Sequence, residues 1–309
     1  MNWIILVVIA QVIYAVVDLV NKFIITSKKI EKPFVFAFFV AVLSAISIVV
    51  FIPGSLGLKI GAFNLPAIQN VGWPSASIVA MSLVVGFTFF YALVSLYSAL
   101  RDADASDVLP VVGSVSAFVT FIFSLLVFRE SLSQNFFIGF SFLVLGTLLI
   151  STMRLKKATQ MESVNAGIMF AINAAMMKAM FNISSFDHAF FWSKVGLLFF
   201  LLSLLLVPRY AGKFKTNVKR TKKSSSVWVI GNTMLAGVAT FMVLKSIEMG
   251  NVSVIQSLGG LKFAFIVIIS VVFGKFIPKE AGENNTIKDI VQKGVATVII
   301  LFGFFYLFL

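Results

Sequence analysis

Charged side chains inside long apolar stretches are the residues most able to do chemistry in this chain, because a charge in such surroundings is costly. Lys262 is the clearest case, since it lies near the middle of the apolar stretch Val252–Phe273, shortly after Gly259-Gly260. An ammonium at that depth could bind the anionic group of a substrate, and the glycines would let a ligand approach closely. The alternative is a buried structural ion pair with Asp18 or Glu248.

The first apolar stretch carries further polar groups. Asp18 and Lys22 are four residues apart, so on a helix they would share a face and could pair. In one interpretation Lys22 extends to the membrane surface and Asp18 neutralises it. In the other, Asp18 is a protonatable carboxylate that couples a transport cycle to protons. Asn21, in the same stretch, could bind substrate or join a polar contact between helices.

Other lysines admit simpler interpretations. Lys194 lies about two turns into the apolar stretch Phe186–Val207, where it could face a cavity or extend to the surface. Lys178 lies close to a helix end, so we expect it to reach the membrane surface. Lys245 and Glu248 have the spacing of a local ion pair.

Several aromatic and amide side chains are also candidates for a binding site. Tyr14, Tyr91 and Trp192 combine a ring with a hydrogen-bond donor, and could line a cavity for an organic substrate or pack between helices. Gln256 lies nearly two turns before Lys262, and interhelical hydrogen bonding is its alternative role.

Catalytic and metal chemistry find little support. The chain has no cysteine and one histidine, His188, so thiolate metal sites are excluded and a Ser-His-Asp triad would depend on that one residue. His188 itself would be an ordinary interfacial residue or a pH-sensitive gate. The sequence contains no Walker phosphate-binding loop. We therefore expect no metal, no cofactor, no catalytic residue and no enzymatic activity.

The composition shows what surrounds these residues. Hydrophobic residues make up 60% of the 309 positions and charged residues only 12%, with a mean hydropathy of +1.03. A soluble domain usually has about a quarter of its residues charged. The outer surface must therefore face lipid. The formal net charge of +13 would suggest nucleic acid in a soluble protein, so the basic residues must first be placed relative to the membrane.

Ten apolar stretches are long enough to cross a bilayer, which takes about 20 residues of helix. They lack the alternation of barrel strands, and helices satisfy their own backbone groups in lipid. The predicted fold class is an all-α integral membrane protein with ten transmembrane helices. The predicted helices are Trp3–Thr26, Phe34–Ile52, Ser75–Leu100, Ala105–Phe128, Leu132–Met153, Ser163–Phe181, Phe186–Val207, Val227–Glu248, Val252–Phe273 and Asp289–Phe308.

Basic residues between these helices are distributed unevenly. The odd-numbered loops hold most of them, whereas the even-numbered loops and the termini hold only Lys59 and Arg129. The positive-inside rule then places the odd-numbered loops in the cytoplasm and both termini outside. These charges are topology signals, which removes the nucleic-acid interpretation. The loop before Val227 could also contact anionic lipid.

The second half of the chain repeats features of the first at an offset of 147 residues. The aligned identities fall in the fourth and ninth predicted helices, so each half, 1–157 and 158–309, contains five helices. A repeat with an odd number of spans is inserted upside down relative to its twin, as in many secondary transporters, whose substrate site lies between the repeats. The identities are Ser106/Ser253, Gly113/Gly260, Ala117/Ala264 and Phe118/Phe265.

One segment resembles a known family. Arg129-Glu130-Ser131 after an apolar helix, followed by Gly139 and Gly146 in the next helix, resembles an EamA-type repeat of the drug/metabolite transporter superfamily, and the second copy would be SVIQSLGGLKFAFIVIISVVF. The resemblance implies alternating access through a central cavity formed by helices 1, 3, 4, 6, 8 and 9. Substrates vary across the superfamily. Its members are often described with cytoplasmic termini, whereas the charges here indicate the opposite.

These observations favour a secondary active transporter, an exporter or exchanger of a small organic metabolite. The excess of intramembrane lysine favours an anionic or zwitterionic substrate, with a proton or an exchanged metabolite as a further partner. A membrane-embedded lipid-modifying enzyme or a channel is the alternative. We expect a multi-pass protein of a prokaryotic plasma (inner) membrane, in contact with lipid and monomeric, although an oligomer is compatible with the sequence.

Overall fold

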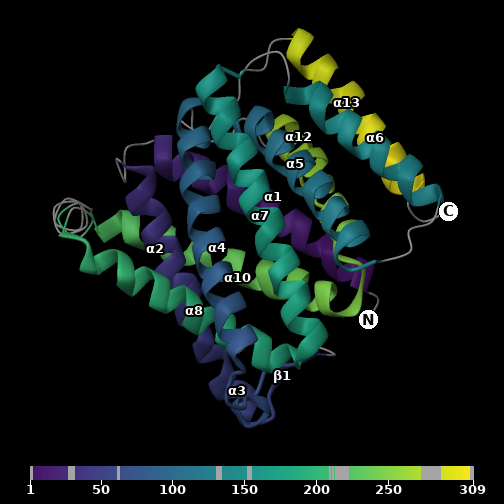
Figure 1. Ribbon diagram of the computed structural model, residues 1–309. Helices are drawn as coiled ribbons and strands as arrows, with labels where there is room; N and C mark the ends of the chain where they lie inside the picture. Colours follow the sequence, from purple (N-terminus) through teal and green to yellow (C-terminus); the bar gives the residue numbers. More distant parts are fainter. Residues whose placement is uncertain are drawn as a thin grey trace.

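The computed structural model describes residues 3–26, 32–60, 63–129, 134–151, 155–208, 210, 212, 223–272 and 287–306. These residues form a bundle of helices with one small antiparallel pair of two-residue strands (Figure 1). The elements, in chain order, are α1 (Trp3–Thr26), α2 (Pro33–Ile46), η1 (Ser47–Val50), α3 (Phe51–Ser55), β1 (Lys59–Ile60), β2 (Phe63–Asn64), η2 (Ile68–Asn70), α4 (Ala76–Asp102), α5 (Ala105–Leu126), α6 (Gln134–Ser151), α7 (Lys157–Ile183), α8 (Phe186–Leu206), α10 (Lys223–Met249), α11 (Val252–Leu258), α12 (Leu261–Val272) and α13 (Ile287–Tyr306).

The lengths and composition of these helices are those of a multi-pass membrane protein. Within the described residues, seven helices are long and apolar enough to cross a bilayer: α1, the segment Pro33–Ser55, α4, α5, α7, α8 and α10. Three shorter apolar helices occupy the positions of the fifth, ninth and tenth predicted spans. The prediction of an all-α membrane protein is thereby confirmed.

Short polar side chains begin several helices, as their sequence positions suggest. The hydroxyl of Ser75 accepts from the backbone N–H of Ile78 at the start of α4, and Ser185 caps α8 in the same way. The side chain of Asn251 accepts from two backbone N–H groups at the start of α11. Such caps satisfy donors that have no partner within the helix.

Two predicted helices are not continuous. The second passes from α2 through the 3₁₀ turn η1 into α3, so Pro53 lies inside the last short helix instead of ending the span. The ninth predicted helix divides into α11 and α12 around Gly259 and Gly260, where the backbone forms i→i+3 hydrogen bonds. The predicted helix Val252–Phe273 is thus interrupted by a tight turn, and Phe273 lies outside the described residues.

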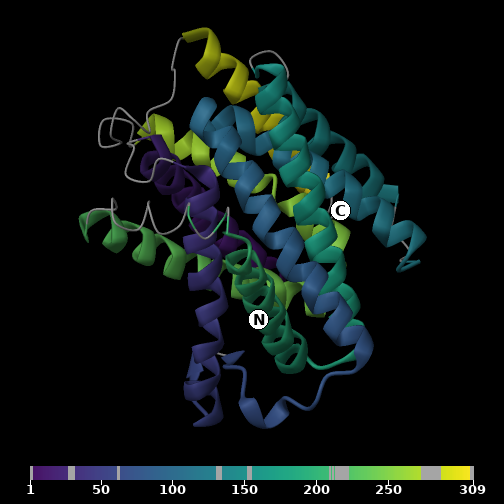
Figure 2. The same ribbon diagram turned by 60° about the vertical axis from the view of Figure 1, so that its left-hand side comes forward.

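The motif that carried the family resemblance is only partly described. Arg129 lies three residues after the end of α5, in the left-handed region with φ 51°, and Glu130 and Ser131 lie outside the described residues. Gly146 of α6 faces Ala296 and Ile300 of α13, where a side chain would collide. Both views show α6 and α13 side by side along one edge of the bundle (Figures 1 and 2).

The centre of the bundle is held by close helix crossings. α4 packs along both α7 and α8, and α1 packs along α10. At the α4–α8 crossing, a Cβ on Gly86 would meet the backbone of Leu197, and a Cβ on Gly196 would meet the backbone of Ser82. Glycines allow two helix backbones to approach this closely in a membrane.

We expect Gly196→Ala to lower stability by about 1–3 kcal/mol, because the new methyl group would force α4 and α8 apart. Gly231→Ala is the matched control, since a Cβ there meets nothing within 4 Å. The midpoint of thermal unfolding in detergent, followed by size-exclusion chromatography, measures the difference. Equal midpoints for the two variants would contradict the close crossing.

Candidate functional site

A cavity of about 590 Å³ lies between α2 with the adjoining η1, α8 and α10, with single lining residues from α1, α4 and the segment after β2. Its volume falls within the range of about 300–1,000 Å³ that small-molecule sites occupy. Most of its lining is apolar, and the polar lining residues are Ser44, Ser47, Lys194, Thr233, Thr240 and Lys245. The helices that line it differ from the set implied by the family resemblance: the second and seventh spans contribute, and α5, α7 and α11 contribute no lining residue in the described part of the chain.

Lys194 is the buried cation of this cavity. Only 8% of the residue is exposed, and its ammonium donates to the hydroxyl of Ser44 across 3.1 Å. It also lies 5.1 Å from the ring centroid of Phe190 and 6.0 Å from that of Phe89, within reach of cation–π attraction. Among the described residues, no carboxylate forms an ion pair with it. Within the described part of the chain, its charge is therefore compensated by one hydroxyl dipole and two rings.

Lys245, the other lysine on the cavity wall, is neutralised locally. Its Nζ lies 2.5 Å from Oε2 of Glu248, and 4.4 Å from the ring centroid of Phe186. The predicted local pair of Lys245 with Glu248 is thereby confirmed. A lysine that is already paired offers less to an incoming anion than Lys194 does.

Lys262 forms an ion pair with Asp18, which was the alternative to a ligand-binding role. Its Nζ lies 2.8 Å from Oδ2 of Asp18 and 5.8 Å from the ring centroid of Tyr14. The Asp18 side chain is 7% exposed, so the pair is largely withdrawn from solvent. Lys262 follows the break between α11 and α12, and it does not line the cavity between α2, α8 and α10.

A polar seam joins α1 to α10 on either side of this pair. The hydroxyls of Tyr14 and Thr240 lie 2.7 Å apart, and the amide of Asn232 donates to Oδ1 of Asn21 across 2.8 Å. Since Thr240 also lines the cavity, one hydrogen bond connects the cavity wall to the tyrosine that covers Lys262. Tyr14, Asp18 and Asn21 therefore act together as one face of α1.

Two further lysines cap the ends of helices. Lys22 donates to the carbonyls of Leu100 and Ala103 at the end of α4, and the carbonyl groups at a helix end have no partner within the helix. Lys178 donates to the carbonyls of Ile247 and Gly250 at the end of α10, at 3.0 and 2.8 Å. An ammonium is favourable at the negative end of a helix dipole. Extension to the membrane surface, expected for Lys178 and one interpretation for Lys22, stays a prediction, and the structure adds that both lysines bind the carbonyls of a helix end.

The remaining candidates lie away from the cavity lining. Tyr91 packs among aromatic rings of α4 and α8, 4.8 Å from the ring centroid of Phe87 and 6.1 Å from that of Phe200. Gln256 is half-buried on α11, and its side chain forms no hydrogen bond with other described residues. Neither residue joins Lys194 or Lys262.

Hydrogen bonds to Trp192 and its neighbours join the segment Ala67–Gly72 to the first turns of α8. The indole N–H of Trp192 donates to the carbonyl of Gly72, and the N–H of Gly72 donates to Nδ1 of His188. Asp187 accepts from the backbone N–H of Ala67 and from the side chain of Asn70. His188 and Trp192 thus have a structural role at the surface end of α8.

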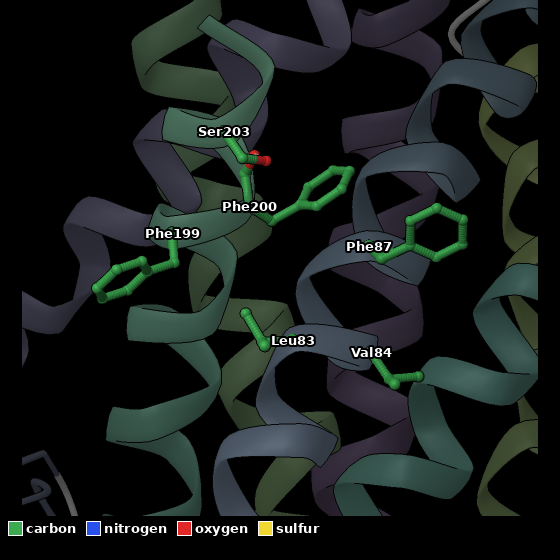
Figure 3. Close-up of a pocket in the computed structure, with 6 residues that line it drawn as sticks. All are labelled: Leu83, Val84, Phe87, Phe199, Phe200 and Ser203. Atoms are coloured by element: carbon green, nitrogen blue, oxygen red, sulfur yellow. The ribbon is translucent and has the colours of Figure 1, made fainter. Parts of the chain in front are cut away.

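A second hollow of about 450 Å³ lies on the outer face of α4 and α8. Figure 3 shows the rings of Phe87 and Phe200, from neighbouring helices, pointing to the same side, while Phe199 points to the opposite side. The ring centroids of Phe87 and Phe200 lie 5.6 Å apart. The remaining lining residues of the hollow are Leu83, Val84 and Ser203. Because it carries no charge and most of its residues are exposed on apolar helices, it is a lipid-facing groove.

Sequence reasoning did not identify several partners in this region. Ser44, Asn232 and Thr240 hold Lys194, Asn21 and Tyr14, respectively. Asn232 could have been noticed as an amide inside the apolar stretch Val227–Glu248. Phe89 and Phe190 gave no signal, because phenylalanine occurs 35 times in the chain.

We expect Asp18→Asn and Lys262→Met each to destabilise the protein by about 3 kcal/mol, because each leaves the other charge buried without its partner. The double variant should lose clearly less than the sum of the two. Arg101→Gln is the control, since the Arg101–Asp102 pair is exposed and worth less than about 1 kcal/mol. Thermal unfolding of all four variants measures the coupling, and additive losses would contradict a tight ion pair.

Comparison with known proteins supports the fold and leaves the family open. No protein-family model and no curated protein sequence matches the chain. Among solved structures, 29 chains match. One, described only as the crystal structure of a protein, superposes with a TM-score of 0.66 at 13% identity, and the match covers 99% of this chain and 96% of the other. At that identity the likeness establishes a shared fold over the whole chain.

Proposed function

We propose that the protein is a secondary active transporter that carries a small organic metabolite, anionic or zwitterionic, by alternating access. The observation that carries this proposal is Lys194, a buried lysine that has no carboxylate partner among the described residues and lines an apolar cavity of 590 Å³. A buried charge without a counter-charge is costly, and in a membrane protein it commonly marks a substrate pathway. A substrate anion would supply the missing charge.

Matched contacts in the two halves support an inverted repeat of five plus five helices, residues 1–157 and 158–309. The offset of 147 residues that relates Ser106 to Ser253 also relates Leu100 and Ala103 to Ile247 and Gly250. The lysines that cap these carbonyl pairs, Lys22 of α1 and Lys178 of α7, are 156 residues apart, the same separation as Val17 and Asn173 in those two helices. Related halves that move against one another are the usual basis of alternating access.

A second matched pair of contacts lies between the halves. Asn232 of α10 donates to the carbonyl of Val17 on α1, and Asn173 of α7 donates to the carbonyl of Val85 on α4. Val85 and Asn232 are again 147 residues apart, so the two contacts bridge corresponding positions with the amide on opposite sides. These contacts favour ten spans and an EamA-like arrangement, and the division of the ninth helix at Gly259–Gly260 resembles the broken helices of transporters.

We further propose that the chain lies in a prokaryotic inner membrane with its odd-numbered loops in the cytoplasm. Contacts between Ala67–Gly72 and α8 support a common side for two even-numbered loops. We expect a membrane-impermeant maleimide to label Lys59→Cys in intact cells, and Lys156→Cys only after permeabilisation. The chain has no native cysteine, so the labelling has no background. The reverse pattern would invert the orientation.

Transport itself is tested in two stages. A panel of organic acids, amino acids and neutral metabolites is first screened for thermal stabilisation of the purified protein, and we expect the ligands to be anions and zwitterions. The best ligand, radiolabelled, is then followed in proteoliposomes. We expect saturable uptake that an excess of unlabelled ligand inside accelerates, and its loss in Lys194→Met.

Other outcomes of the same assay would identify the alternatives. Flux that does not saturate would indicate a channel, and chemical conversion of added lipid would indicate a membrane-embedded enzyme. Lys262 also lies in the membrane, but its charge is paired with Asp18. Lys262→Met should therefore retain ligand binding if it folds. Loss of binding in Lys262→Met but not in Lys194→Met would move the site to the Asp18–Lys262 pair.

A further inference from the structure

We propose that the cavity between α2, α8 and α10 binds an amphiphilic monoanion, with its single anionic group on Nζ of Lys194 and its hydrocarbon body along the apolar walls. This inference names the substrate class of the proposed transporter and rests on that function. The charge on the cavity lining indicates a ligand with a single anionic group. Lys194 holds the one lining charge that is not already paired in the described residues, since Lys245 is bound to Glu248. One free cation matches one anionic group.

The groups around the Lys194 ammonium favour one anionic group over several polar groups. The ammonium of Lys194 is held by Ser44 and lies beside the rings of Phe89 and Phe190. On the described walls the hydroxyl of Ser47 donates to the carbonyl of Ser44, and that of Thr240 is bound to Ala236 and Tyr14. Ser44 and Thr233 are the lining hydroxyls left to hold a second anionic group or several hydroxyls of a ligand. A sugar or a dianion would leave polar groups without partners, which is costly in an apolar site.

The rim of the cavity is apolar. Ile46 and Val49 on the α2 side and Met234 and Val238 on the α10 side line the cavity and are also exposed, Met234 to 70%. An apolar rim of this kind lets a hydrocarbon chain extend from the cavity without contact with charge. A short hydrophilic metabolite would gain nothing from these side chains, whereas burial of each methylene contributes about 0.8 kcal/mol.

The experiment compares three probes that share an eight-carbon chain and differ in the head group: octane-1-sulfonate, octan-1-ol and octyltrimethylammonium. The sulfonate keeps its one negative charge at all working pH values, so it does not cross a bilayer by protonation. Binding is measured by calorimetry in phosphatidylcholine nanodiscs, with protein-free nanodiscs as the reference. We expect saturable binding of the sulfonate, at least tenfold tighter than the alcohol, and no saturable binding of the cation.

Variants then locate the head group. Lys194→Met should weaken sulfonate binding by roughly 10- to 100-fold, to the level of the alcohol, because a charged hydrogen bond is lost. Lys194→Arg should keep the preference for the anion, and it also serves if Lys194→Met does not fold. Phe87→Leu, in the lipid-facing groove on α4 and α8, should leave sulfonate binding unchanged. Equal binding of sulfonate and alcohol by the natural protein, or an undiminished preference in Lys194→Met, would overturn the proposal.

A transport measurement distinguishes failure of the amphiphilic-monoanion proposal from failure of the proposed transport function. Labelled octane-1-sulfonate is followed into proteoliposomes that contain the natural protein or Lys194→Met. Binding that depends on Lys194 without any protein-dependent flux would support the site and contradict transport. Saturable flux of another ligand, combined with no head-group preference in the nanodiscs, would support transport and contradict the amphiphilic monoanion.

Discussion

A hydrocarbon surrounding leaves no water to satisfy a polar group, and this constraint organises the whole structure. Each intramembrane polar side chain described above, with few exceptions, is bound to a carbonyl, a hydroxyl, an amide or an opposite charge. Lys22 and Lys178 satisfy the ends of α4 and α10, Asp18 holds Lys262, and Asn232 holds Asn21. Lys194 departs from this rule, because among the residues that the structure describes it contacts only the hydroxyl of Ser44 and two rings.

Two lysines that look alike in the sequence have different surroundings. Lys262 and Lys194 both lie within apolar helices, and its depth together with the preceding Gly259-Gly260 made Lys262 the stronger candidate. Lys262 faces a carboxylate of α1, so its charge stabilises the contact between α1 and α12. Lys194 faces a cavity, so its charge is available to a ligand. The chemistry of a buried charge depends on its counter-charge, which comes from another helix and is not visible along the chain.

Local signals predicted most of the fold. Apolar length identified the helices, whereas the capping roles of Ser75, Ser185 and Asn251 at the start of three of them emerged only from the structure. The division at Gly259–Gly260 was missed because the apolar pattern runs through it unbroken, although a pair of glycines weakens a helix. The cavity could not be predicted, because its walls are ordinary apolar residues of α2, α8 and α10 that become neighbours only on packing.

The fastening of Ala67–Gly72 to α8 has a mechanical consequence. Asp187, His188 and Trp192 hold that surface segment, and Lys194 lies on the same helix, less than two turns after His188. Helix α8 thus binds the segment Ala67–Gly72 near its first turns and carries the cavity lysine further along. A displacement of α8 would move the segment Ala67–Gly72 together with Lys194. A reagent bound to that segment from the aqueous phase would therefore oppose movement of α8 at the cavity.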